Sequence, residues 1–404
     1  MLILALAVAM RSSALLWMPS FHATYNTTYN IEPDHLTRGG LTRGVVLCAH
    51  NTVTLRLAWT QICALRHLHG LANESFTVYH ADELNYDDHD TREAIKRLGS
   101  LPNVRIENLK EWYHASYSGD QDDKGIERFK GFFCKVGALL SAPHDIVAVV
   151  DLDVVFMDNP FALIETSVFR HTGSYLFRDR RSIVEVESTF EAYRERLTEL
   201  WRLMHPDRPY NVSKELLTSP PYLGWSYHYG ESALVLMNKR RHFEAMCTLQ
   251  RMIGPELFTL TTTGVFGDKE AYWQALALTE KEPGMNPFAC ADVGHMTEHG
   301  NVCNYRHAMA HWVATSRGLP RILYMNGDPV ETLVAGEDDT LLRSWVSHPL
   351  HAFSSRVPSD NAFTGCNRGA NPLPSYVIET FHAYRLIYEQ HEDKRTREQG
   401  AAHR

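Results

Sequence analysis

Two aspartates one residue apart, Asp151 and Asp153, are the residues of this chain best suited to chemistry. They interrupt the apolar run Ala148–Phe156, which ends at the turn residues Asp158–Pro160. A short apolar run bounded by turn residues is typical of a buried strand. Buried carboxylates are costly unless a positive group neutralises them, and hard oxygen ligands suit Mg²⁺ or Mn²⁺. The pair is therefore a candidate metal site, although the same residues could cap turns or pair with arginines.

Other candidate residues, most of them polar, stand close to apolar segments, and ligands of open α/β sheets collect at the carboxyl ends of the strands. They are Ala49, His50 and Asn51 after Gly44–Cys48, Lys135 upstream of the aspartates, Arg178 and Asp179 after Gly173–Phe177, Glu231 ahead of Ala233–Met237, and Asp268 with Lys269 at the start of a helical pattern. Each has a plainer explanation. Lys135 could be a surface lysine, Arg178 and Asp179 a surface ion pair, and Asp268 a helix N-cap.

The bulk composition narrows the function classes. The chain has 404 residues and a net charge of −8, with no Lys/Arg-rich block outside its extreme C-terminus, so binding to nucleic acid is not expected. Its seven cysteines form no C-x-x-C pair, which argues against a structural zinc site. If the chain is secretory, a disulfide among Cys290, Cys303 and Cys366 is expected.

Two features favour the secretory pathway. Residues 2–10 are entirely apolar, but Arg11 interrupts them, so this segment is too short for a convincing membrane span and resembles a weak signal or anchor. Three N-x-S/T sequons begin at Asn26, Asn73 and Asn211. Any membrane association is expected only through the N-terminus.

Strands and helices alternate through the first part of the chain, and neither a G-x-G-x-x-G nor a P-loop motif is present. The pattern predicts an α/β fold with a mostly parallel central sheet and helices on both faces. The expected strands cover residues 44–48, 76–79, 104–106, 148–156, 173–177, 233–237 and 322–325, and the expected helices cover 55–68, 91–98, 126–140, 188–204, 242–253, a segment from 267 and a tail from 374. Segments 112–123 and 206–221 are expected to be loops, and 283–311 to be irregular. We expect a signal-like segment and stem (1–40), a catalytic domain (41–345) and a C-terminal loop and helix (346–404).

The order of these segments resembles the fungal-type α-mannosyltransferases, which include the Golgi α-1,3-mannosyltransferases and have the GT-A (Rossmann-like) fold of nucleotide-diphospho-sugar transferases. The landmarks that carry the resemblance are Gly44-Val-Val, Phe76–His80, Lys135, Ala148–Phe156, Asn159-Pro160, Phe177–Arg180, Glu231–Arg240 and Gly267–Trp273. The chain is also similar to the broader glycogenin-related group of retaining transferases, but it departs from that group's pattern at Glu231–Ala233 and at Asp268-Lys269.

The resemblance implies a metal-dependent transfer of a hexose to a glycan hydroxyl with retention, in the Golgi lumen, using Mn²⁺ or Mg²⁺ and with GDP-mannose favoured as the donor. It assigns Asp151 and Asp153 to the metal, with His311 ahead of His295 as the histidine that completes the site. The implied donor-binding residues are Ala49, His50, Asn51, Lys135, Asp151 and Asp153, the residues facing donor or acceptor are Arg178, Asp179 and Lys269, and the catalytic carboxylates are Glu231 and Asp268.

Three alternatives remain open at this point. The donor could be a UDP-hexose, as in the glycogenin-like group. Val149–Val155 also fits the signature of haloacid-dehalogenase phosphatases, in which Asp151 would be the nucleophile, but Tyr272 stands where a further acidic residue is expected. The chain could also be a secretory glycan-binding protein that has kept the fold without catalysis.

Overall fold

The structure is a computed structural model that describes residues 40–117, 123–179, 187–226, 228–263, 267–315, 320–348 and 366–402. Apart from Gly40, the predicted signal-like segment and stem lie outside these ranges. No helix within the described ranges is both long and apolar enough to cross a membrane.

The first sheet has seven strands in the order β3-β2-β1-β4-β7-β6-β8. The run β3-β2-β1-β4 is parallel, β7 lies antiparallel between β4 and β6, and β8 is parallel to β6. The strands are β1 Arg43–Cys48, β2 Ser75–His80, β3 Val104–Asn108, β4 Ile146–Val150, β6 Ser174–Arg178, β7 Gly230–Asn238 and β8 Met285–Ala289. The predicted α/β class with a mostly parallel sheet is confirmed.

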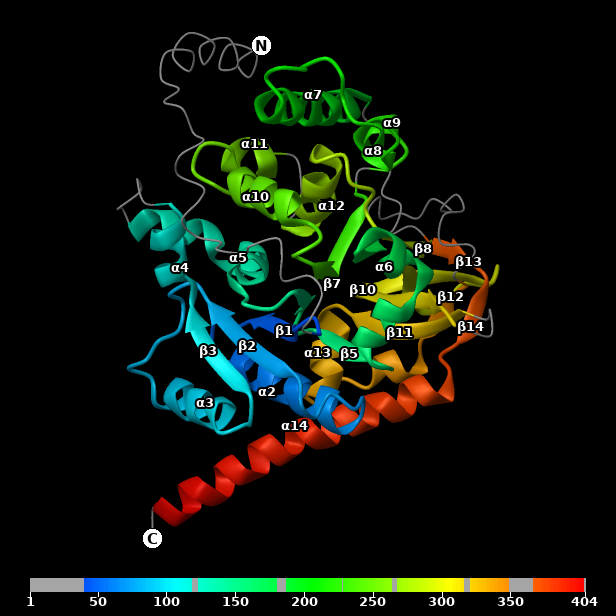
Figure 1. The fold of residues 1–404 in the computed structure, drawn as a ribbon. Coiled ribbons are helices and arrows are strands. Elements are labelled where there is room, and N and C mark those ends of the chain that lie inside the picture. Colours follow the sequence, from blue (N-terminus) through cyan, green and yellow to red (C-terminus); the bar gives the residue numbers. More distant parts are fainter. Residues whose placement is uncertain are drawn as a thin grey trace.

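Helices cover both faces of this sheet (Figure 1). Alternate strand residues point to opposite faces: Val149 packs in the core that includes α5 and α12, whereas Ala148 and Val150 pack in the core that includes α2 and α3. The helices are α2 Thr52–His67, α3 His89–Gly99, α4 Leu109–Ser116, α5 Cys134–Ser141, α6 Ser167–Thr172, α7 Glu187–Met204, α8 Lys214–Leu217, α9 Pro220–Leu223, α10 Phe243–Met252, α11 Phe258–Thr262 and α12 Lys269–Leu278. The short helix η6 (Pro160–Glu165) follows the aspartate segment.

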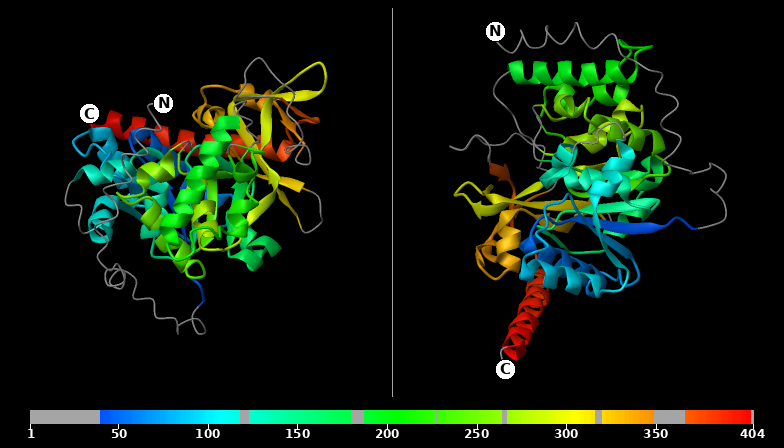
Figure 2. Two further views of the ribbon diagram at one scale, coloured as in Figure 1. Left: turned by 90° about the horizontal axis from the view of Figure 1, so that it is seen from above. Right: turned by 90° about the vertical axis from the view of Figure 1, so that its left-hand side faces the viewer.

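The second sheet has the order β14-β12-β9-β10-β11-β5, with β13 paired to β10, and all its pairs are antiparallel. Its yellow and orange strands lie to one side of the molecule in both views of Figure 2. Its elements are β5 Val154–Phe156, β9 Ala291–Met296, β10 Asn301–Ala314, β11 Pro320–Asn326, β12 Trp345–Ser347, β13 Cys366–Arg368 and β14 Ala370–Pro372, covered by α13 Asp328–Val334 and α14 Ser375–Ala402. Side chains of α13 and α14 share its apolar core.

Several predicted boundaries were wrong. The run 148–156 is not one strand, because β4 ends at Val150 in the first sheet and β5 begins at Val154 in the second. A loop was expected over 112–123, but residues 112–116 belong to α4, which begins at Leu109 with the Asn108 side chain accepting from the Lys110 N–H; residues 118–122 lie outside the described residues. The helix expected from 126 begins only at Cys134, because most of residues 123–133 form 3-10 turns. The loop expected over 206–221 contains α8 and the start of α9, and the segment 283–311, expected to be irregular, contains β8, β9 and most of β10. The domain boundary at 345/346 stays a prediction.

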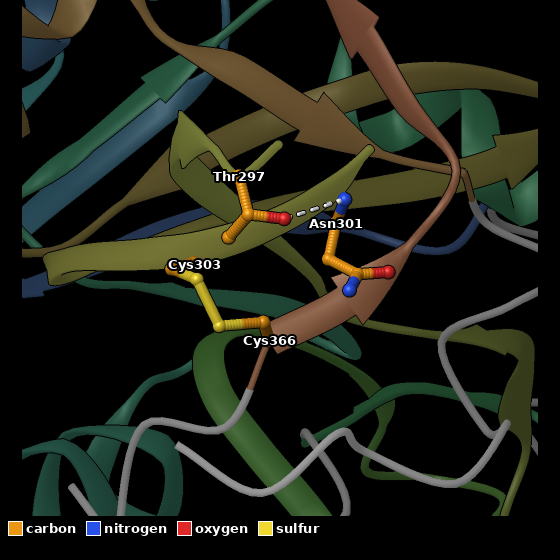
Figure 3. Close-up of a disulfide and its surroundings, with 4 residues drawn as sticks. All are labelled: Thr297, Asn301, Cys303 and Cys366. Carbon is orange, nitrogen blue, oxygen red and sulfur yellow. Dashed lines mark hydrogen bonds between the residues drawn. A yellow bond between two sulfur atoms is a disulfide. The ribbon is translucent and has the colours of Figure 1, made fainter. Parts of the chain in front are cut away.

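A disulfide joins Cys303 on β10 to Cys366 on β13 (Figure 3). The turn that precedes β10 is fixed beside it, because the N–H of Asn301 donates to Thr297 Oγ1 at 3.1 Å. The expectation of a disulfide among three cysteines is therefore confirmed, and the third of them, Cys290, is buried and lies outside this disulfide.

Candidate active site

The aspartate pair lies at the joint between the two sheets. Asp151 follows β4, and its N–H donates to the carbonyl of Ala233 on β7 at 3.0 Å. Asp153 precedes β5, and its Oδ2 accepts from the N–H of Gly327 at 3.2 Å. Both side chains are partly exposed. The two aspartates are therefore anchored to different sheets, Asp151 through its backbone and Asp153 through its carboxylate, and both side chains are partly exposed.

Lys135 is the buried cation of this site. Its side chain is 5% exposed, and Nζ lies 2.9 Å from Asp151 Oδ1 and 3.2 Å from Asp268 Oδ1. Nζ also lies 2.9 Å from Ser232 Oγ. Burial alone would lower the pKa of Lys135, but the two carboxylates outweigh it and raise that pKa. Lys135 is thus not a surface lysine but a charged link between α5, the end of β4 and the start of α12.

Asp268 stands at the N-cap position of α12, but its side chain makes no capping hydrogen bond. Instead, Oδ1 accepts from Ser232 Oγ at 3.0 Å and Oδ2 accepts from Tyr272 OH at 2.7 Å. With Lys135 also in contact, both oxygens of this buried carboxylate are engaged. The sequence analysis missed the roles of Ser232 and Tyr272. The spacing of Tyr272, one helical turn after Asp268, was the available signal.

Glu231 lies near the start of β7, next to the Ala233 carbonyl that receives the N–H of Asp151. Its Oε1 accepts from the N–H groups of Ser232 (2.9 Å) and Ala233 (3.0 Å). Burial, together with the nearby carboxylate of Asp179, raises the pKa of Glu231. The structure thus fixes one oxygen of this carboxylate with the backbone of its own strand.

Asp179 pairs with Lys269, with Nζ 2.6 Å from Oδ2. The guanidinium of its neighbour Arg178 lies 5.6 Å from the centre of the Tyr229 ring. The thiol of Cys290 lies 3.8 Å from Asp179 Oδ1. The carboxylate of Asp179 is therefore part of a buried ion pair that crosses from β6 to α12, not of a surface pair with Arg178.

Glu270 is a buried carboxylate whose role the sequence analysis did not anticipate. Its Oε1 accepts from the N–H groups of Tyr229 (2.9 Å) and Gly230 (3.3 Å), and its Oε2 accepts from Tyr193 OH (3.1 Å) and Trp273 Nε1 (2.6 Å). These four hydrogen bonds satisfy the carboxylate, and none of them comes from a lysine. Its position fixes the start of β7, and so the backbone that presents Glu231.

The residues after β1 are positioned by the first turn of α2. Asn51 caps this helix through a bond from the Thr54 N–H to Asn51 Oδ1 at 2.9 Å. His50 is exposed, and Ala49 donates its N–H to the Tyr79 carbonyl at 2.9 Å. The three residues lie at the carboxyl edge of β1, the strand next to β4.

Among the histidines proposed for the metal, His311 is buried on β10, with Nε2 3.0 Å from Asn326 Oδ1 and its ring stacked on Tyr324. His295 is exposed on β9, opposite Cys303. Within the described residues, no group of three or more His, Cys, Asp or Glu side chains forms a ready metal cage. The assignment of a histidine to the metal stays a prediction.

The charge balance at the joint fits a divalent cation. Lys135 contacts Asp151 and Asp268 and also acts electrostatically on Asp153 and Glu231, so four carboxylates share this lysine. Burial, only partly offset by Lys135, raises the pKa values of Asp151 and Asp153. Two partly exposed carboxylates with excess negative charge are a donor set that hard cations prefer.

Comparison with known proteins settles the family. A family model described as "Mannosyltransferase putative" matches residues 42–316, more than half of the chain. The chain belongs to this mannosyltransferase family. The match contains the aspartate pair and its surrounding residues.

Several sequence relatives are fungal proteins. The chain is 26% identical over 186 residues to "Putative alpha-1,3-mannosyltransferase MNN12" of Candida albicans, covering 46% of this chain and 21% of that protein. It is 23% identical over 288 residues to "Putative alpha-1,3-mannosyltransferase MNN14" of the same organism, covering 69% of this chain and 39% of that protein. The matches therefore span only about a fifth to two fifths of these relatives. Among solved structures, core-mannan synthase A from Aspergillus fumigatus in its Mn/GDP form matches with 12% identity and a TM-score of 0.37, covering 63% of this chain and 74% of that chain.

Proposed function

We propose that the protein is a metal-dependent glycosyltransferase that moves mannose from GDP-mannose to a glycan hydroxyl with retention. Membership of the mannosyltransferase family supports the class of reaction. The single observation that carries the proposal is the position of Asp151 and Asp153 at the joint of two sheets, partly exposed and beside a buried lysine. Such a site can hold a cation next to a diphosphate.

Asp151 and Asp153 are the residues that would hold Mn²⁺ or Mg²⁺, and His311 is the candidate third ligand. When bound, the cation supplies Lewis-acid neutralisation of the nucleoside diphosphate leaving group. Lys135 fixes the Asp151 carboxylate through a 2.9 Å contact and adds a positive charge on the same side. Ala49, His50 and Asn51 line the donor's path along the neighbouring strand end.

The two candidate catalytic carboxylates differ in what their oxygens contact. Asp268 uses both oxygens for Ser232, Tyr272 and Lys135. Among the described residues, Glu231 uses Oε1 for two backbone N–H groups and makes no hydrogen bond through Oε2, which we assign to the substrate. We therefore assign Glu231 to the developing positive charge of the sugar and Asp268 to the positioning of Lys135. Arg178 and the Asp179–Lys269 pair are the candidates for gripping sugar hydroxyls.

Two surface features support a secretory-pathway location. The sequon residues Asn73 and Asn211 are both exposed, as glycosylation requires, and Asn26 lies outside the described residues. The Cys303–Cys366 disulfide is typical of an oxidising compartment. These features favour the lumen of the Golgi.

The test is nucleotide release from a panel of nucleotide sugars that includes GDP-mannose and UDP-hexoses, with Mn²⁺ and with EDTA. Release of GDP that requires the metal is expected. Asp153→Asn should abolish it, whereas Asp158→Asn, a change at an exposed aspartate five positions on, should not. Release of UDP alone would show that the donor is a UDP-hexose and not GDP-mannose. Release of neither nucleotide would overturn the proposal. The anomeric configuration of the product, read by NMR, tests retention.

A further inference from the structure

Tyr324 of β11 is a buried residue at the contact between the two sheets. Its side chain is 0% exposed. Its ring stacks on the ring of His311, with 4.3 Å between the centroids, and meets the Phe177 ring edge-on at 4.9 Å. His311 lies on β10 of the second sheet, whereas Phe177 lies on β6 of the first. The tyrosine ring is therefore packed between strands of both sheets.

The hydroxyl group of Tyr324 has no hydrogen-bond partner among the residues that the structure describes, although it is buried. A buried polar group that lacks a partner costs free energy, and phenylalanine would fill almost the same space without this cost. The packing of the ring alone therefore does not account for a tyrosine at this position. A hydrogen bond that forms when substrate is bound would account for it.

Glu231 points into the same region. The Ser232 hydroxyl contacts side chains of α5 and of the N-cap of α12, so Glu231, the preceding residue of β7, points to the opposite face of the sheet. Glu231 stands opposite Phe177 in the ladder between β7 and β6, and the side chains of such a pair lie roughly 5 Å apart. Because Phe177 also packs against Tyr324, the side chains of Glu231 and Tyr324 both adjoin the Phe177 ring.

The electrostatic surroundings of the hydroxyl support this placement. Burial raises the pKa of Tyr324 well above its usual value, and the carboxylate of Glu231 is the group that adds most to this rise. Smaller contributions come from Cys290, Asp151 and Tyr175. The Glu231 carboxylate is thus the negative group that acts most strongly on the hydroxyl.

Of these groups, Glu231 is the one with an oxygen still to be used. Its Oε1 accepts from two backbone N–H groups, and its Oε2 makes no hydrogen bond among the described residues. The other three groups are engaged: the Tyr175 hydroxyl donates to Asn286 Oδ1 at 3.1 Å, the Cys290 thiol lies 3.8 Å from Asp179 Oδ1, and both oxygens of Asp151 lie within 3.0 Å of Lys135 Nζ. The hydroxyl of Tyr324 and the second oxygen of Glu231 therefore suit each other as donor and acceptor.

We propose that Tyr324 is a positioning residue for Glu231, and that its hydroxyl donates to Oε2 of that carboxylate in the donor-bound enzyme. This inference rests on the proposed function, in which Glu231 faces the sugar. Each carboxylate oxygen has two lone pairs, so Oε2 can accept from Tyr324 while it also faces the sugar. With Oε1 held by the backbone and Oε2 by Tyr324, the carboxylate keeps one orientation while positive charge develops on the sugar.

The experiment compares Tyr324→Phe with the wild type, using the full chain with Mn²⁺ and GDP-mannose. The kcat of GDP release should fall by about 10- to 100-fold, the value of a hydrogen bond to a charged group. The dissociation constant of GDP should not change, because GDP carries no sugar for Glu231 to face. The thermal midpoint should stay the same or rise, because the hydroxyl that is removed is buried without a partner.

The matched control is Tyr175→Phe. Tyr175 is also buried and packs against the same Phe177 ring at 5.3 Å, but its hydroxyl donates to Asn286. This variant should lower the thermal midpoint and leave kcat unchanged. The two substitutions remove the same atom from neighbouring tyrosines and are expected to have opposite effects on stability and activity.

A double variant tests whether Tyr324 acts through Glu231. In the Glu231→Gln background, Tyr324→Phe should cause no further loss of GDP release, measured in single turnovers with enzyme in excess. A full further loss would show that the tyrosine acts on another group and would overturn the inference.

The remaining outcomes separate this inference from the proposed function. Unchanged kcat in Tyr324→Phe would overturn the inference and leave the transferase intact. A fall in kcat together with a fall in the thermal midpoint would show a purely structural role and would also overturn it. Absence of GDP release by the wild type would overturn both proposals.

Discussion

The two sheets that meet at the active site hold their aspartates in different ways. On the first sheet, Asp151 is held by the buried ammonium group of Lys135. On the second sheet, Asp153 is held by the backbone N–H of Gly327, and the sheet itself is tied by a disulfide and covered by α13 and α14. One side of the site is thus organised by buried charge and the other by backbone and covalent links. Different changes should damage each side.

The largest effect is expected from removing the buried cation. Lys135→Met leaves Asp151 and Asp268 without their shared partner, and breaking a buried ion pair in this way costs about 3–5 kcal/mol. We expect that loss in the free energy of unfolding, measured with urea, together with loss of nucleotide release.

The matched control is Lys96→Met, which removes an exposed lysine of α3 whose side chain is 78% exposed. It should leave both the unfolding curve and nucleotide release unchanged. Equal stability of Lys135→Met and Lys96→Met would contradict the view that buried charge organises the first side.

A smaller effect is expected on the second side. The Cys303–Cys366 disulfide closes a loop of 63 residues, and replacing both cysteines by serine should lower the free energy of unfolding by about 2–4 kcal/mol. Because Cys303 lies eight residues before His311 on β10 and neither cysteine is a proposed ligand or catalytic residue, the double variant should keep most of its metal-dependent nucleotide release at low temperature. Complete loss of release in a variant that still folds would show that the two sides are not separable.

The effect that is smallest at neutral pH concerns a second buried lysine, Lys239, which follows β7 and whose ammonium group donates to the carbonyls of Leu140 and Ala142. Burial lowers its pKa from 10.5 to about 7, and Asp145 offsets this only in part. Between those pH values the unfolded chain binds a proton that the folded chain does not. The free energy of unfolding should therefore rise with pH across this window, by at most about 1.4 kcal/mol per pH unit.

This contribution is absent from Lys239→Met. The difference in unfolding free energy between the wild type and this variant should thus increase from pH 7 to 10 and stay constant below pH 7. A difference that does not depend on pH would show that Lys239 keeps an ordinary pKa. The result would sharpen the contrast with Lys135, which is equally buried but faces carboxylates.

The first sheet was predictable because its strands are buried on both faces, so apolar runs such as Val147–Val150 stand out between polar turns. The second sheet was not predictable in the same way. β10 mixes polar and apolar residues over fourteen positions, and its sheet also takes in β5 and β12 to β14 from distant parts of the chain. The break between β4 and β5 was not predictable either, because apolar residues flank the aspartates on both sides and look like one continuous strand.

The candidate site was predictable as a set of residues but not as a set of contacts. The positions of Lys135, Asp151 and Asp268 around one point follow from two helices that begin, and a strand that ends, at the same edge of the first sheet. The hydrogen bonds that Tyr272 and Ser232 donate to Asp268 depend on how side chains of α12 and β7 pack together. Residue spacing alone does not determine that packing.

The chain leaves the first sheet at Val150 and enters the second at Val154, so residues 151–153 connect the two sheets directly. Any rotation of the second sheet against the first alters the gap between the carboxylates of Asp151 and Asp153. A cation held by both carboxylates would bind with an affinity that depends on how the second sheet is placed against the first. By thermodynamic linkage, a bound cation would in turn restrict how far the two sheets can rotate relative to each other.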